Sequence, residues 1–304
     1  MTSTSQQFTC ADGRELDVRL SGSDEPDATV VIYHPGTPSS GRVPDDLVRV
    51  AQERGLRLLS WSRPGYSTST RRLGRSVADV TNDAREILDR LGIATAFTIG
   101  WSGGGPHALA CAALMPDRIR GVASLAGVAP YRESIDSLNW MAGMGQDNID
   151  EFGAALAGES VLAPALAAAR EGLVAITADG IVAEMESLLP DVDRGFIGSG
   201  FGEDLAASFR ESVSVSADGW VDDDVAFTRP WGFDLASITV PVAIWQGSED
   251  LMVPFSHGQW LAAAMPFARA NLIEGEGHLS VVVGSIHDII DDLIAHPSSP
   301  SPLP

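Results

Sequence analysis

The stretch TIGWSGGGPHAL (98–109) places one serine, Ser102, among four glycines. Such a run is typical either of a loop that wraps a phosphate or of a sharp turn that presents a nucleophile. A phosphate-binding P-loop needs a lysine after its last glycine, but no lysine or arginine lies between Arg90 and Arg118. The dinucleotide-binding pattern G-x-G-x-x-G is not matched from Gly100 either. The sequence therefore disfavours a phosphate site here.

The pattern G-x-S-x-G, matched by GWSGG at 100–104, is typical of a serine nucleophile held between a strand and a helix. The apolar run AFTIGW (96–101) predicts the strand, and GPHALACAALMP (105–116) predicts the helix. Glycines on both sides of the serine let these elements approach more closely than Cβ atoms would allow. The N–H of Gly103 then lies at the helix N-terminus, where it can stabilise an oxyanion. We therefore predict that Ser102 is a catalytic nucleophile.

A serine hydroxyl needs a base that removes its proton and a carboxylate that orients this base. Among six histidines, His278 stands in the loop EGEGHLS (274–280), directly after a predicted strand, and we predict that it is the base. Structural, surface or capping roles are predicted for the other five, which are His34, His107, His257, His287 and His296.

The stretch WQGSEDLMVP (245–254) leaves the end of a predicted strand and enters a loop. Loops at the C-terminal ends of parallel strands are where catalytic groups assemble. Asp250 is therefore the predicted acid, with Glu249 as the alternative. The charge run from Asp222 to Asp224 is predicted to be solvated instead.

Short apolar runs alternate with amphipathic stretches in the first part of the chain. The predicted strands lie at 29–34, 56–61, 96–101 and 121–130, and the predicted helices at 43–55, 77–92 and 105–116. This alternation, with its short connections, predicts an α/β fold with a mostly parallel, doubly wound sheet.

From about residue 131 the alternation stops, and the following hundred residues indicate several helices without a strand. It resumes with strands predicted at 240–247 and 269–275 and with helices predicted at 258–266 and 279–296. We therefore predict an α/β core, a helical cap and a flexible tail rich in proline and serine, at residues 1–130 with 232–296, 131–231 and 297–304 respectively.

The composition of the 304-residue chain restricts its partners. Acidic residues outnumber basic ones by 41 to 20, and the net charge of −21 disfavours binding to nucleic acid or to an anionic membrane. No apolar run reaches the ~20 residues of a transmembrane helix, and we find no secretory signal. Two cysteines, Cys10 and Cys111, do not make a disulfide framework. We expect a cytoplasmic monomer or homodimer that acts on a small molecule without a metal or organic cofactor.

The order Ser102, Asp250, His278 on a predicted α/β core resembles the α/β-hydrolase superfamily, in its capped branch of esterase and proline-iminopeptidase-like serine hydrolases. The resemblance covers nearly the whole chain and is carried by HPGTP (34–38), SRPGYS (62–67), GWSGGG (100–105), GSEDLMVP (247–254) and GEGHLS (275–280). It implies a helical cap inserted after the sixth strand. Haloalkane dehalogenases and epoxide hydrolases need an aspartate in place of Ser102, so the sequence excludes these activities.

The resemblance also implies a second oxyanion donor. In the family, the loop after an early strand usually begins His-Gly, and the next residue supplies an N–H. Here Pro35 intervenes, and the matching pair is Gly36 and Thr37. The role therefore passes to Thr37, with Gly36 as the alternative, beside the N–H of Gly103. The segment SRPGYSTS (62–69) lacks the family's aspartate and second glycine.

A serine hydrolase of this type would cleave an ester-like bond, namely a carboxylester, lactone or thioester, of a small and largely apolar substrate through an acyl-enzyme intermediate. The cap would form a lid, with its carboxylates facing solvent. The predicted walls of the substrate pocket are Gly36, Trp101, Trp140 and Trp220.

Two alternatives stay open. A substrate ammonium bound by carboxylates of the cap would favour a proline-iminopeptidase-like aminopeptidase, and the candidates are Glu184, Glu186, Asp191 and Asp193. A ligand receptor without catalysis would use the same scaffold, because a fold does not fix a function. Repeated turnover of a p-nitrophenyl ester would exclude the receptor.

Overall fold

The computed structural model describes residues 4–131, 138–198, 200–265 and 267–295. In these ranges an 8-stranded sheet has the order β1-β2-β4-β3-β5-β6-β7-β8. The strands are β1 (Thr4–Thr9), β2 (Glu15–Gly22), β3 (Thr29–His34), β4 (Leu56–Trp61), β5 (Ala96–Trp101), β6 (Ile119–Leu125), β7 (Val242–Gly247) and β8 (Arg269–Ile273). The pairs β1–β2 and β2–β4 are antiparallel, and the pairs from β3–β4 to β7–β8 are parallel.

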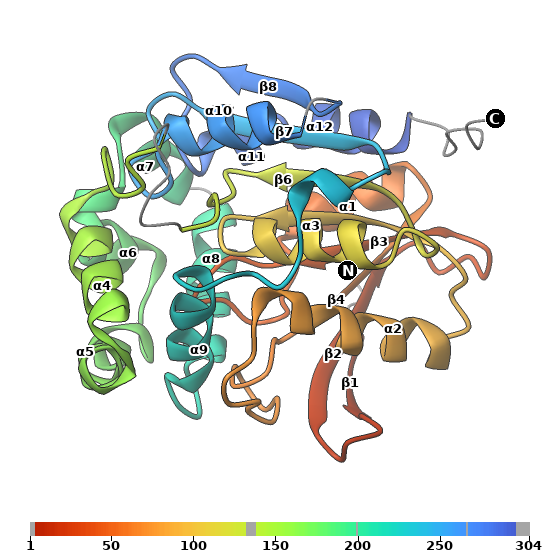
Figure 1. Ribbon diagram of the computed structural model, residues 1–304, viewed down its shortest axis with the longest axis horizontal. Helices are drawn as coiled ribbons and strands as arrows, with labels where there is room; N and C mark the ends of the chain where they lie inside the picture. The colour runs from red at the N-terminus through yellow and green to blue at the C-terminus, as the bar shows by residue number, and fades with distance from the viewer. Residues whose placement is uncertain (1–3, 132–137, 199, 266, 296–304) are drawn as a thin grey trace.

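Helices cover both faces of the sheet (Figure 1). On one face the core includes α1 (Asp45–Glu53), α11 (Ser280–Val283) and α12 (Ile286–Ile294), and on the other α2 (Val80–Arg90), α3 (Gly104–Leu114) and α10 (Phe255–Ala264). Neighbouring residues of a strand point to opposite faces, so Val31 belongs to the first core and Ile32 to the second. Strands β5 and β7 are buried along their whole length because helices cover them on both sides.

Between β6 and β7 the described residues form helices and no strand, and we call α4–α9 the insertion. Its helices are α4 (Gln146–Ala157), α5 (Glu159–Leu173), α6 (Ala178–Glu184), α7 (Asp191–Ile197), α8 (Gly200–Ser212) and α9 (Asp218–Phe227). Short 3-10 helices occur at Val77–Asp79, Glu186–Leu188 and Leu235–Ser237. Figure 1 shows the insertion, in green and teal, gathered beside the sheet, with α7 packed near α11.

The structure confirms the predicted α/β fold class, with a mostly parallel sheet and helices after the sixth strand. The sequence analysis missed β1 and β2, because β1 is mostly exposed and polar and carries no apolar run. The predicted closing helix is divided into α11 and α12 at Gly284 and Ser285. The predicted tail, 297–304, and residues 132–137 of the predicted cap lie outside the described residues. None of the helices described is both long and apolar enough to cross a membrane.

Candidate active site

Ser102 stands at the turn between β5 and α3, where its backbone has a φ of 54°. This left-handed region is unfavourable for a residue with a Cβ atom, so the surrounding contacts must hold the turn. The N–H of Ser102 donates to the carbonyl of Leu125 at 2.8 Å, and the N–H of Gly105 donates to the carbonyl of Ser102 at 2.9 Å. A Cβ on Gly104 would collide with the carbonyl of His34, so only glycine fits there. Ser102 therefore occupies a strained strand–helix turn, as the sequence predicted.

Asp250 and His278 come from the loops after β7 and β8, and the structure brings their side chains together. The Nδ1 atom of His278 lies 2.7 Å from Oδ2 of Asp250, and both residues are buried. The other oxygen of Asp250 accepts the N–H groups of Met252 and Val253, each at 2.8 Å. The side-chain amide of Gln246 donates to Oδ2 at 2.8 Å. The carboxylate is thus placed to accept a hydrogen bond from Nδ1–H, and this tautomer gives Nε2 of His278 the lone pair of a base.

A second carboxylate, from Asp193 in α7 of the insertion, holds the loop that carries His278. Its Oδ2 accepts the N–H of His278 at 2.8 Å. Its Oδ1 accepts the N–H groups of Leu279 at 3.1 Å and Ser280 at 2.8 Å. Asp193 was a candidate for binding a substrate ammonium, but it is fully buried and already accepts three amides. It is therefore a support for the histidine loop, which the sequence analysis missed.

Neighbouring groups change the pKa of the His278 imidazole, which lies beside the serine turn. Burial disfavours the charged imidazolium, but the carboxylates of Asp250 and Asp193 prevail, so that the pKa of His278 is raised above its ordinary value. The ring of His278 lies 5.6 Å from that of Trp101, the residue before Ser102. The indole N–H of Trp101 also donates to the carbonyl of His278 at 3.4 Å. The histidine is thus next to the serine turn although 176 residues separate them in the chain.

The loop after β3 places Gly36 and Thr37 beside the serine turn. A Cβ on Gly36 would lie 3.3 Å from the Cβ of Ser102, so Gly36 packs closely against the serine side chain. The side chain of Thr37 packs against Gly103, and its hydroxyl donates to Asp223 at 2.8 Å. The N–H of Gly103 is at the start of α3, where backbone amides have no partner within the helix. The two predicted oxyanion donors, Gly103 and Thr37, are therefore neighbours.

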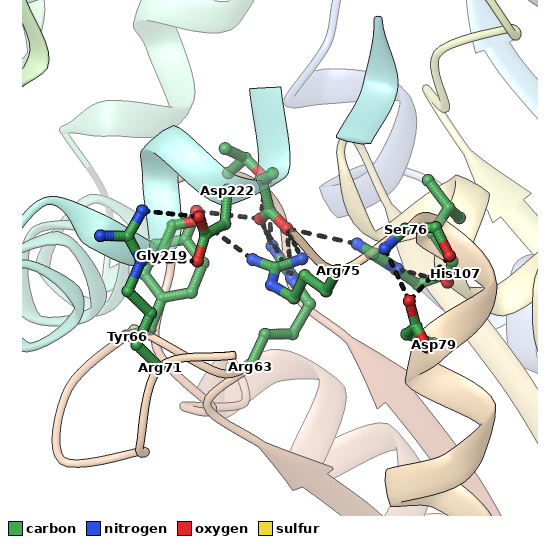
Figure 2. Close-up of polar contacts among 12 residues, drawn as sticks. Arg63, Tyr66, Arg71, Arg75, Ser76, Asp79, His107, Gly219 and Asp222 are labelled. Carbon is green, nitrogen blue, oxygen red and sulfur yellow. Dashed lines mark hydrogen bonds and ion pairs between the residues drawn. The ribbon is translucent and has the colours of Figure 1, made fainter. Parts of the chain in front are cut away.

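A buried ion network connects α9 of the insertion to this loop. Asp223 is fully buried and pairs with Arg63 and Arg75, each at 2.6 Å. The hydroxyl of Tyr66 donates to the same carboxylate at 2.9 Å, and Nε2 of His107 lies 3.4 Å from it. Figure 2 shows Arg63, Arg75 and His107 converging on this point. Burial alone would raise the pKa of Asp223, but the two guanidinium groups outweigh it and hold that pKa well below its ordinary range.

Arg63 extends the network to the backbone of the oxyanion loop. Its guanidinium donates to the carbonyls of Pro35 at 2.6 Å and Gly36 at 2.8 Å. The prediction that the run Asp222–Asp224 is solvated is wrong, because all three side chains are buried under packed helices. Asp222 pairs with Arg71 at 2.8 Å (Figure 2). The run therefore ties the insertion to the core.

Comparisons with known proteins agree with this architecture. Residues 29–165 match a family model described as alpha/beta hydrolase fold. The chain has the α/β-hydrolase fold. The enol-lactonase from Burkholderia xenovorans LB400 is 20% identical, with a TM-score of 0.66 over 96% of this chain and 100% of the enol-lactonase. Carboxylesterase CesB (YbfK) from Bacillus subtilis is 15% identical, with a TM-score of 0.65 over 97% of this chain and 93% of the esterase.

A curated protein of Bacillus subtilis (strain 168), named "Uncharacterized hydrolase YcgS", is 28% identical to this chain over 108 residues. The matched region spans 36% of this chain and 36% of that protein. The predicted resemblance to α/β hydrolases is thus confirmed for the fold.

In this α/β-hydrolase fold, Ser102 lines a cavity of about 380 Å³ between the core and the insertion. Thr37 and Gly103 also line it, so the candidate oxyanion donors face the same space as the serine. Most of the wall is apolar, and its larger side chains include Phe152, Leu162, Leu166, Phe209, Trp220 and Phe227. The cavity therefore suits a small substrate with apolar parts.

Only one of the three tryptophans predicted for the pocket, Trp220, lines this cavity. Trp101 is packed between Phe201 and His278, with ring distances of 5.9 and 5.6 Å. Trp140 packs perpendicular to Phe152 at 4.7 Å and stands behind it rather than in the wall. The cavity lining therefore does not include Trp101, Trp140 or Gly36, and the predictions for these three residues are wrong for this cavity.

The prediction that the carboxylates of the insertion face solvent holds for Glu184, Glu186 and Asp191, which are exposed, but not for all of them. Asp224 of α9 is fully buried and lines the cavity of Ser102, together with the half-buried Glu151 of α4. A sequence signal for Asp224 existed, because it shares a helical face with Trp220 and Phe227, four residues before and three after it. Neither Glu151 nor Asp224 was predicted as a pocket residue.

Proposed function

We propose that the protein is a serine hydrolase that cleaves an ester-like bond of a small substrate through an acyl-enzyme intermediate on Ser102. One observation carries the proposal. Ser102 is held at a left-handed strand–helix turn and lines a mostly apolar cavity, and the buried pair of His278 and Asp250 lies beside that turn. A serine backbone in this strained left-handed conformation persists only where the surrounding structure holds it there, and such strain is common at active sites.

In the first step, the Oγ of Ser102 attacks the carbonyl carbon of the substrate, and its proton passes to Nε2 of His278. The Nδ1–H of the imidazolium stays bonded to Asp250, whose carboxylate stabilises the new positive charge. The negative charge on the carbonyl oxygen is stabilised by the N–H groups of Gly103 and Thr37. Each such donor contributes about 3 kcal/mol to the stability of the transition state in a water-excluded site.

The tetrahedral intermediate then collapses. The bond to the leaving group breaks, His278 returns the proton to the leaving oxygen or sulfur, and Ser102 carries the acyl group. Water enters, His278 removes one of its protons, and the resulting hydroxide attacks the acyl carbon. Ser102 leaves with the proton from His278, so that the free acid and the original enzyme are regenerated.

The test combines turnover with covalent labelling. The protein should hydrolyse p-nitrophenyl acetate repeatedly, and a fluorophosphonate probe should label Ser102 alone, as tryptic mass spectrometry shows. Ser102→Ala should remove both activities while circular dichroism stays unchanged. A folded protein that neither turns over short p-nitrophenyl esters nor reacts with the probe would contradict the proposal and favour the ligand receptor.

A further inference from the structure

The guanidinium of Arg63 is a buried cation in contact with the oxyanion loop, residues 35–38. Arg63 follows β4, and its side chain is only 2% exposed. Its Nη1 donates to the carbonyl of Pro35 at 2.6 Å, and its Nη2 donates to the carbonyl of Gly36 at 2.8 Å. Burial disfavours the charged guanidinium, but the charge of Asp223 outweighs burial and raises the pKa of Arg63 above its ordinary value. A full positive charge therefore lies against the backbone of this loop.

The two carbonyls that Arg63 binds belong to the peptide groups of the two candidate donors. The carbonyl of Gly36 and the N–H of Thr37 form one peptide group, and the carbonyl of Pro35 and the N–H of Gly36 form the other. Both peptide groups are trans, so the carbonyl and the N–H of each point in opposite directions. The two N–H groups therefore point away from the guanidinium that holds their carbonyls.

The N–H of Thr37 is available to a substrate. In the described part of the chain, neither a backbone carbonyl nor a side chain accepts it. Thr37 lines the cavity together with Ser102 and Gly103, whereas Arg63 does not line it. The Gly36–Thr37 peptide group thus separates a buried cation from the space in which the substrate carbonyl would lie.

Asp223 fixes the guanidinium in this orientation. The Nε and Nη2 atoms of Arg63 donate to Oδ2 of Asp223 at 3.1 and 2.6 Å. The hydroxyl of Thr37 donates to the same oxygen at 2.8 Å and accepts a hydrogen bond from Nη2 of Arg63 at 3.0 Å. One ion pair therefore holds both the side chain of Thr37 and the carbonyl of the peptide group before it. The N–H of Thr37 cannot turn without breaking charge-assisted hydrogen bonds.

A cation at a peptide carbonyl also affects the N–H of the same peptide group. The donor draws electron density toward the carbonyl oxygen, and the N–H becomes more positive and a stronger donor, by about 10–30% per hydrogen bond. An N–H that is already oriented needs no rearrangement when negative charge develops on the substrate. Both effects are larger for an oxyanion than for a neutral carbonyl, so they stabilise the transition state more than the bound substrate.

We propose that Arg63 is a positioning residue of the oxyanion site, which orients the Gly36–Thr37 peptide group and strengthens the N–H of Thr37 as a donor to the substrate. This inference rests on the proposed function, because it concerns the same reaction. The guanidinium does not line the cavity, so it acts through the peptide group and not by contact with the substrate. A loss of Arg63 should therefore lower kcat much more than it changes KM.

Arg75 provides the matched control. Its guanidinium pairs with the same carboxylate of Asp223 at 2.6 Å, but it donates to the carbonyl of Gly219 and not to the oxyanion loop. Arg63→Met should lower kcat for p-nitrophenyl acetate by about 10–100-fold and keep KM within threefold, because the donor stays in place but is weakened and less well oriented. Arg75→Met should lower kcat less than fivefold, although both variants lose a buried ion pair. An equal loss of kcat in the two variants would overturn the inference.

A pair of ketones measures the oxyanion site directly. The carbonyl of 1,1,1-trifluoro-4-phenylbutan-2-one accepts the Oγ of Ser102 and forms a hemiketal oxyanion, which ¹⁹F NMR detects, whereas 4-phenylbutan-2-one binds only as a neutral ketone. Arg63→Met should weaken the trifluoromethyl ketone by about the same factor as kcat and the methyl ketone less than twofold. Arg75→Met should weaken the trifluoromethyl ketone less than fivefold. Equal weakening of both ketones by Arg63→Met would mean a disturbed cavity and would overturn the inference.

Arg63→Lys decides the question if circular dichroism shows that Arg63→Met does not fold. Lysine keeps a cation beside Asp223, but its single nitrogen cannot reach both carbonyls and the carboxylate as the planar guanidinium does. Its affinity for the trifluoromethyl ketone should be at least threefold below that of the wild type, with the methyl ketone unchanged. Wild-type affinity for both ketones in a folded Arg63→Lys would overturn the inference.

Because formation of the hemiketal needs no turnover, the two proposals fail separately. A protein that forms the hemiketal with an affinity that depends on Arg63 but hydrolyses no ester retains the oxyanion site and loses the hydrolase. A protein that hydrolyses p-nitrophenyl acetate equally well as Arg63→Met and as Arg75→Met retains the hydrolase and loses the role of Arg63. A protein that neither forms the hemiketal nor hydrolyses the ester loses both.

Discussion

The substitution Asp193→Asn tests whether the insertion positions the candidate base. Asp193 lies in α7, and its two carboxylate oxygens accept the N–H groups of His278, Leu279 and Ser280. Asparagine has the same shape but only one acceptor oxygen. When that oxygen faces Leu279 and Ser280, the new NH₂ group points at the N–H of His278, and two donors oppose each other.

The magnitude follows from these three contacts. A hydrogen bond to a buried charged group contributes about 1.5–3 kcal/mol, and the variant loses one such bond and the charge on the other two. We expect the free energy of unfolding to fall by about 2–4 kcal/mol. The opposed donors should also displace the imidazole of His278, and a shift of a catalytic group by about 1 Å can lower kcat/KM up to 100-fold.

The pH profile separates a positioning role from a loss of stability. Because the neutral form of His278 is the base, kcat/KM should rise with pH through a pKa that lies above the ordinary 6.5 of histidine. Asp193→Asn removes one of the two charges that raise this pKa, so the acid limb should move to lower pH.

Urea unfolding followed by tryptophan fluorescence, and kcat/KM for p-nitrophenyl acetate at pH 5–9, measure both effects. The control is Asp191→Asn, on the same helix but fully exposed, which should leave the profile and the stability unchanged. If Asp193→Asn behaves like this control, the carboxylate does not position the histidine, and our reasoning about the loop is refuted.

Three further predictions concern the acid, the buried network and the cavity. Asp250→Asn should lower kcat by about 10³–10⁴-fold in steady-state kinetics, because it favours the wrong tautomer of the base. Glu249→Gln, at an exposed position, should keep kcat within threefold of the wild-type value. The reverse order would mean that we have assigned the wrong acid. Asp223→Asn leaves the guanidinium groups of Arg63 and Arg75 buried without their carboxylate. It should therefore lower the free energy of unfolding, measured in urea, by about 3–5 kcal/mol. A loss below about 1 kcal/mol would contradict the importance of the network. Each methylene added to the acyl chain of a p-nitrophenyl ester should improve kcat/KM by up to about 0.8 kcal/mol until the cavity is full, and a flat series from acetate to octanoate would argue against an apolar acyl site.

The sequence by itself determined the α/β core and the positions from which the candidate catalytic groups come. The turn at Ser102 is a local feature, because glycines within two residues allow the close approach of β5 and α3 and no distant contact is needed to recognise them. The loops of Asp250 and His278 could be predicted for a related reason. Loops that follow parallel strands meet at one edge of the sheet, whatever their separation in the chain.

The tertiary structure alone decided what surrounds each charge. The run Asp222–Asp224 has the composition of a solvated helix face, yet its three carboxylates meet three different environments. Asp222 pairs with Arg71, Asp223 joins the buried arginine network, and Asp224 lines the cavity, where burial raises its pKa. Consecutive helical residues point about 100° apart, so each side chain packs against a different part of the fold.

The same cause explains Asp193, which the sequence suggested as a ligand for substrate and the structure places under the histidine loop. The charge state of a carboxyl group depends on its burial and on partners from distant segments. Glu151 and Asp224, for example, lie 73 positions apart in the chain. The local pattern of residue types in a sequence shows where the chain turns and which face of a helix is apolar. Packing between helices and sheet determines which acids pair with arginines, which hold a loop and which line the cavity.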